Sequence, residues 1–167
     1  YPWSQIYTDD SFYDFGADFQ PQHNVNVNEA LKFPPLAWLF THNKFDHDAF
    51  QIGIANIDRR AGRIDGQDSG SEMITNRSST AGVEFCCDVE RILSDGIAIN
   101  ILGDPKIADQ MEKVAYNSVP AHTSALMRQM TYYQLPNEGT CTRGGHGFTQ
   151  DYDNGTVPGP HSGYPCC

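Results

Sequence analysis

Hydrophobic residues recur at intervals of three and four positions along two stretches in the first part of the chain, which is the pattern of an amphipathic helix. The first stretch runs from about residue 25 to residue 42, and Pro34-Pro35 interrupts it, which predicts a kink or two short helices. The second runs from about residue 46 to residue 59, and its apolar side consists of Phe50, Ile54 and Ile57. We expect these helices to form the first of two pairs.

The middle of the chain predicts a second pair of helices. From about Val83 to Leu102 the apolar residues fall on one stripe, formed by Cys86, Val89, Leu93, Ile97 and Ile101. Gly103 is the expected end of this helix, and Asp104-Pro105 supplies an N-cap and a proline for the start of the next. That helix continues to about residue 117, and we expect it to bury Ile107, Met111, Val114 and Ala115.

The segments outside the helices are polar or irregular. Residues 1–22 mix aromatic and acidic side chains and predict an irregular lead-in, whereas residues 61–80 are rich in Gly, Ser and Asp and predict a loop. Little periodicity follows residue 117, and no internal repeat is present. The sequence therefore predicts an all-α domain over residues 23–167, with about four helices in two pairs. Its long loops are the expected place for functional residues.

The composition excludes several classes of protein. Hydrophobic residues make up 39% of the 167 positions and charged residues 19%, which is typical of one globular domain. A net charge of −10 with scattered Lys and Arg argues against nucleic acid and fits a neutral carbohydrate better. No apolar run is long enough to span a membrane. Glycosylation sequons at Asn76 and Asn154 slightly favour an extracellular, secreted glycoprotein.

The cysteines suggest a metal site. There are five, an odd number that argues against a fully paired disulfide scaffold. Glu84 and Cys86, together with the Cys166-Cys167 pair, could complete the tetrahedral shell that zinc prefers. A disulfide between the two cysteine pairs, or buried unreactive thiols, would explain the same residues. Taken singly, Glu72 and the histidines, including His146 and His161, do not indicate a catalytic or binding role.

Four segments in order resemble landmarks of glycoside hydrolase family 127, the β-L-arabinofuranosidase-like enzymes. They are HNVNVNEALKFP, SGSEMITNRSSTAGVEFC, LGDPKIADQMEKVAYNSVPA and SGYPCC. The resemblance covers roughly residues 20–167 and implies part of an (α/α)6 barrel. Family members are longer, so it also predicts that these residues belong to a longer chain or contact partner subunits.

The resemblance implies a role for each matching residue. Cys166 corresponds to the nucleophile and Glu72 to the general acid/base. Glu84, Cys86, Cys166 and Cys167 correspond to zinc ligands, and His23 to a substrate-binding histidine. The implied activity is retaining hydrolysis of a terminal β-L-arabinofuranosyl or related linkage in a glycan, through a zinc-bound cysteine.

The chain also departs from the family pattern. Ser71 stands where an Asp usually precedes the glutamate in the family. The segment Ala81-Gly82-Val83-Glu84-Phe85-Cys86 differs from the family's Gly-Thr-Glu-Leu-Cys element. Cys87 is an extra thiol beside a predicted ligand and could compete for the metal or become oxidised. The alternative functions are therefore a non-catalytic carbohydrate-binding protein, or a structural or assembly protein that retains the glycosidase scaffold.

Overall fold

The computed structural model describes residues 3–9, 23–128 and 130–136. Its elements in chain order are α1 (Trp3–Thr8), α2 (Asn24–Ala30), α3 (Phe33–Thr41), α4 (Lys44–Arg60), β1 (Val83–Glu84), α5 (Phe85–Leu102), α6 (Pro105–Ala121) and β2 (Tyr133–Gln134). The described chain is mostly helical, which confirms the all-α prediction and is consistent with a part of an (α/α) barrel. None of the described helices is both long and apolar enough to cross a membrane.

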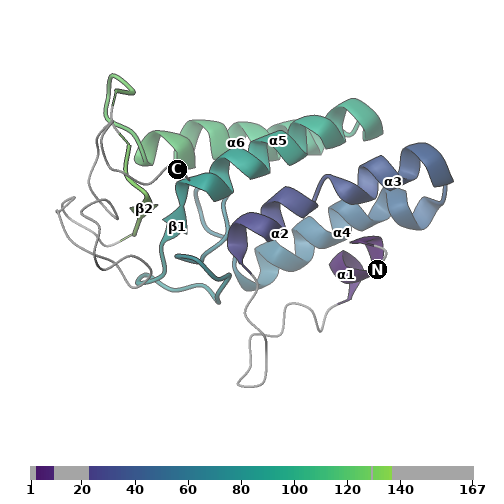
Figure 1. Cartoon of the computed structure of the whole chain (residues 1–167), viewed down its shortest axis with the longest axis horizontal. Coiled ribbons are helices and arrows are strands. Elements are labelled where there is room, and N and C mark those ends of the chain that lie inside the picture. Colours follow the sequence, from purple (N-terminus) through teal and green to yellow (C-terminus); the bar gives the residue numbers. More distant parts are fainter. Residues whose placement is uncertain (1–2, 10–22, 129, 137–167) are drawn as a thin grey trace.

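The helices lie roughly along one direction. Figure 1 shows α5 and α6 side by side, with α2, α3 and α4 beneath them and α1 against α4. The antiparallel strands β1 and β2 pair at the end of the molecule where α5 begins, with Val83 opposite Gln134 and Glu84 opposite Tyr133. The short sheet and the loop 61–82 therefore lie at the same end of the helices.

Local signals account for several helix ends. The side chain of Asn43 accepts a hydrogen bond from Phe45 N (3.0 Å), which caps the start of α4. Asp104 caps α6 in the same way, through Lys106 N (3.0 Å), and Gly103 ends α5 with φ 70°. The first predicted helix is indeed two short ones. The break lies just before the two prolines, which occupy the first turn of α3, where no intrahelical N–H is needed.

The start of the chain differs from the expectation. Residues 1–22 were predicted to be irregular, but Trp3–Thr8 form a helix. Tyr7 is 1% exposed, donates a hydrogen bond to Val27 O (2.5 Å) and packs closely over Gly53, where an added Cβ would lie 2.9 Å from the Tyr7 Cβ. This helix is stabilised by tertiary packing against α4, which the periodicity of six residues does not reveal.

The buried face of α5 also differs from the expectation. Val89 and Leu93, from the predicted apolar stripe, are 51% and 48% exposed. The residues that α5 buries are Cys87, Asp88, Arg91, Ser94, Asp95 and Ala98, most of them polar or charged. The prediction was wrong for these two positions because much of the buried face of α5 meets hydrogen-bonding partners on α2, α6 and the loop 61–82, while Ala98 joins the apolar core.

A buried ionic network joins α2, the loop and α5. Nε of Arg91 lies 3.2 Å from each carboxylate oxygen of Asp95, and Nη1 lies 3.8 Å from Oδ1 of Asp68. Asn28 Nδ2 donates to both oxygens of Asp68 (3.3 and 3.2 Å). Ser94 Oγ donates to the Asn28 carbonyl (2.7 Å). Burial raises the pKa of Asp68 to about 6 in spite of the nearby Arg91.

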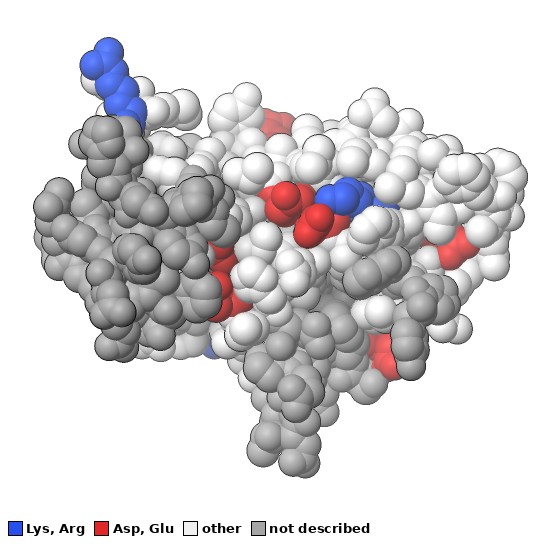
Figure 2. Space-filling view, viewed as in Figure 1, with Lys and Arg blue, Asp and Glu red and all other residues white. Residues whose placement is uncertain are grey.

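Large apolar side chains are exposed on both helix pairs. They are Leu39, Phe40, Phe45, Ile52, Val89, Leu93 and Tyr116. Among the described residues on the face shown in Figure 2, most of the surface is uncharged, with a few Asp, Glu, Lys or Arg side chains between. This exposure accords with the expectation that more of the chain or partner subunits contact these helices, which stays a prediction.

Candidate active site

The loop 61–82 places Glu72 between two other segments. Gly70 N donates to Gly82 O (2.8 Å), and Gly70 forms a parallel bridge with Val83 at the start of β1. On the other side, Asn24 N donates to the carbonyl of Glu72 itself (2.8 Å). The backbone of Glu72 is therefore held against the start of α2, while its loop is held against β1.

Gly70 is required for this arrangement. A Cβ at this position would lie 2.4 Å from the carbonyl oxygen of Met73 and 2.9 Å from the Cα of Ile74, both backbone atoms. We expect Gly70→Ala to force the loop to shift and to destabilise the protein by about 1–3 kcal/mol, the usual cost of overpacking. Urea unfolding measures this change.

The matched control is Gly96→Ala. A Cβ at Gly96 would meet only Met111 Sδ, at 3.9 Å, and the residue lies inside α5. Since Ala is favoured over Gly in a helix interior, this variant should gain about 0.5–1 kcal/mol. Equal stability of the two variants would contradict the account of Gly70.

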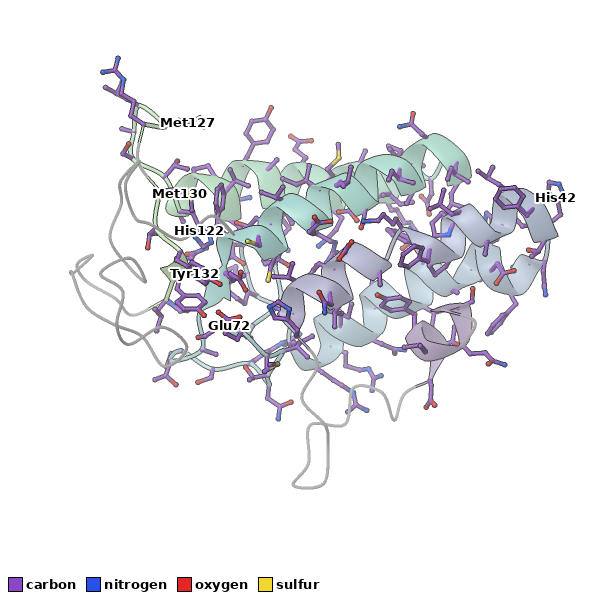
Figure 3. All side chains as sticks on the ribbon, viewed as in Figure 1. His42, Glu72, His122, Met127, Met130 and Tyr132 are labelled. Carbon is purple, nitrogen blue, oxygen red and sulfur yellow. The ribbon has the colours of Figure 1, made fainter. Side chains whose placement is uncertain are left out.

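Three side chains from different segments meet at this end of the molecule. Nε2 of His23, which precedes α2, lies 3.2 Å from Oε2 of Glu72 and 3.6 Å from Oε2 of Glu84. One ligand atom from each residue falls within 4.8 Å of the other two. Figure 3 shows Glu72 beside Tyr132 at the end of the helices opposite His42. The structure thus brings together three of the residues that the sequence singled out.

Two tyrosines that the sequence did not indicate bind Glu72. The hydroxyl of Tyr132 donates to Oε1 of Glu72 at 3.1 Å, and the hydroxyl of Tyr133 also bonds to this oxygen. Pairing of β2 with β1 places them there, because Glu84 lies opposite Tyr133 and Phe85 N donates to Tyr132 O (2.9 Å). A two-residue strand leaves almost no periodic signal in the sequence. Only the presence of two adjacent tyrosines could have suggested that this segment contributes to the site.

The two neighbouring cysteines face different surroundings. Cys86 lies in the first turn of α5 and is partly exposed, two residues after Glu84. Cys87 is fully buried, and burial raises the pKa of its thiol well above the ordinary value, which disfavours the thiolate that metals and electrophiles require. Cys86 is thus the better candidate ligand of the two. Cys166 and Cys167 lie outside the described residues.

Glu84 and Cys86 suit a zinc site in kind. Glu84 is 0% exposed and precedes the first turn of α5, yet its carboxylate does not cap the helix. A buried carboxylate is normally paired with a cation or hydrogen-bonded, and Nε2 of His23 lies 3.6 Å from Oε2 of Glu84. Carboxylate and thiolate are both ligands that zinc accepts.

The site therefore holds a buried glutamate and a partly exposed one, the latter bound by two tyrosine hydroxyls, where the start of α2, the loop 61–82 and β1 meet. The family model of the β-L-arabinofuranosidase catalytic domain, glycoside hydrolase family 127, matches residues 64–167. This is more than half of the chain, and the chain belongs to this family. No curated protein and no solved structure matches it.

The matched range includes Glu72, Glu84 and Cys86, as well as the final Cys166-Cys167 pair. His23 lies before this range, and the structure places it beside both glutamates, as the resemblance of residues 20–167 led us to expect. Membership of the family supports a glycoside hydrolase and a carbohydrate substrate.

Proposed function

We propose that the chain carries the catalytic centre of a retaining glycoside hydrolase acting on terminal β-L-arabinofuranosyl or related linkages. The observation that carries this proposal is the meeting of Glu72 with His23 and Glu84, both glutamates lying in the segment that matches the family. Glu72 keeps 17% of its side chain exposed, so a glycosidic oxygen can reach it, and two tyrosines orient its carboxyl group.

In the first step, the thiolate sulfur of Cys166 bonds to the anomeric carbon while the bond from that carbon to the glycosidic oxygen breaks. Glu72 gives its proton to the departing oxygen. In the second step, Glu72 takes a proton from water, whose oxygen displaces the sulfur and regenerates the thiolate. The two displacements retain the anomeric configuration.

The proposed metal ligands are Glu84, Cys86, Cys166 and Cys167. Bound zinc would keep the nucleophilic thiol deprotonated at neutral pH. His23 has a third of its side chain exposed beside both glutamates, which suits a hydrogen bond to a sugar hydroxyl. We also propose an extracellular location, which the exposed position of Asn76 in its sequon supports.

Metal analysis combined with a hydrolysis assay tests the proposal. We expect one zinc per chain and release of arabinose from an aryl β-L-arabinofuranoside. Cys166→Ser should abolish turnover, because a serine hydroxyl is a weaker nucleophile and a poor zinc ligand. Removal of zinc with a chelator should abolish it as well.

Two results would contradict this assignment. A disulfide between Cys86 and either Cys166 or Cys167 in the active protein would remove the proposed ligands. Tight binding of an arabinoside without any turnover, in protein that retains its zinc, would favour the non-catalytic carbohydrate-binding alternative.

A further inference from the structure

A second carboxylate, one helical turn after Glu84, joins the segments that form the site. Asp88 is fully buried on α5, and its Oδ1 accepts two hydrogen bonds. One comes from Gln67 Nε2 (2.9 Å), in the loop that carries Glu72, and the other from Ser118 Oγ (2.9 Å), on α6. Asp88 thus connects three segments through one oxygen.

Its other oxygen makes no hydrogen bond within the described residues but lies near a histidine that contacts the segment before β2. Oδ2 of Asp88 lies 3.4 Å from Nε2 of His122, whose Nδ1 lies 3.3 Å from the carbonyl of Thr131, two residues before β2. The ring of His122 packs against Phe85, with centroids 5.1 Å apart. Figure 3 shows His122 near Tyr132 and at the same end of the molecule as Glu72.

A second route reaches β2 through α6. Gln134 Nε2 donates to the hydroxyl of Ser118 (3.1 Å), which itself donates to Asp88. Ser118 and Asp88 are buried, as are Gln67 and His122, so loss of any partner leaves a polar group away from water. Such a network tolerates few alternative arrangements of its segments.

The connected segments are the ones that supply the candidate site. The loop carries Glu72, β1 carries Glu84, the start of α5 carries Cys86, and β2 begins with Tyr133. We propose that Asp88 is a positioning residue: by holding the loop, α6 and β2 against the first turn of α5, it sets the placement of Glu72 relative to Glu84 and Cys86. Its effect on catalysis rests on the proposed function, but its effect on geometry does not.

The test compares Asp88→Ala with Asp88→Asn, which keeps an acceptor oxygen for Gln67 and Ser118. Asp46→Ala is the matched control: Asp46 is a buried carboxylate that accepts hydrogen bonds from Ser4 Oγ (2.5 Å) and Thr41 Oγ1 (2.6 Å). It lies on α4, at the opposite end of the helices from the short sheet.

The measurements are kcat, KM, thermal stability and amide hydrogen exchange of the full chain. The amides of Gly70 and Phe85 report the geometry without any substrate, because they bond to Gly82 O and Tyr132 O across the segments in question. Their exchange rates can therefore be compared whether or not the protein turns over.

For Asp88→Ala we expect kcat to fall by about 10- to 100-fold with little change in KM, which is typical of lost outer-shell support. Exchange at Gly70 and Phe85 should rise about tenfold or more. Asp88→Asn should restore both readouts to within about threefold of the parent protein. Asp46→Ala should lose stability but leave kcat and these two amides unchanged.

The proposal is overturned if Asp46→Ala accelerates exchange at the two amides as much as Asp88→Ala does, since the effect is then general destabilisation. It is also overturned if exchange is unaffected in Asp88→Ala. If the parent protein shows no turnover, the proposed function has failed, and the exchange rates alone decide the role of Asp88.

Discussion

Glu72→Gln is expected to lower kcat on natural arabinosides by about 10²- to 10⁴-fold, the usual contribution of a general acid/base. The amide of glutamine cannot protonate the departing oxygen or accept a proton from water. It does keep a carbonyl oxygen. This oxygen can accept hydrogen bonds from the hydroxyls of Tyr132 and Tyr133, both of which bind Oε1 of Glu72 in the structure. The variant should therefore fold normally but show the lowered kcat.

Leaving groups of different basicity separate this role from a structural one. An aryl arabinoside with an acidic phenol needs little protonation, so its bond cleavage should be slowed least by Glu72→Gln. Glu90→Gln is the control, because this glutamate lies on α5 and pairs with Lys32 (3.4 Å) outside the site. An undiminished rate of Glu72→Gln on natural arabinosides would assign the acid/base to another residue.

Arg91→Met is expected to destabilise the protein by about 3–5 kcal/mol, the usual cost of removing one partner from a buried ionic group. Arg91 is 0% exposed and lies beside Asp68 and Asp95, both also buried. Methionine fills part of the volume but leaves the two carboxylates without their positive charge. Urea unfolding of the variant and the parent protein measures the loss.

The pH dependence of stability gives a sharper form of this prediction. Burial raises the pKa of Asp68 from 3.8 to about 6, so the folded chain binds more protons than the unfolded chain between these values. Its contribution to stability is present below about pH 4 and is lost as the pH rises through 6. The slope is at most about 1.4 kcal/mol per pH unit for one proton.

Removal of Arg91 should extend that loss to higher pH, because the guanidinium favours the charged form of Asp68. Adding Asp68→Asn to Arg91→Met should recover part of the stability at pH 7 and flatten the pH profile. A single Arg91→Met variant that keeps the stability and pH profile of the parent protein would show that the network contributes nothing.

Local sequence determined several of the helix ends in this chain. The cap residues Asn43 and Asp104 and the left-handed Gly103 act through neighbours within a few positions, so their effect can be predicted without knowledge of the fold. The same holds for the prolines that begin α3. Resemblance to the family also indicated Glu72, Glu84 and Cys86 as residues of one site, although periodicity alone did not.

Only the tertiary structure decided which face of α5 is buried and which residues complete the site. Arg91 and Asp88 are buried because residues far away in the chain supply their partners, against the preference of charged side chains for water. Tyr132 reaches Glu72 across 60 positions through the pairing of two short strands. Contacts of this kind depend on which segments meet in space, and no periodicity within a single segment encodes that.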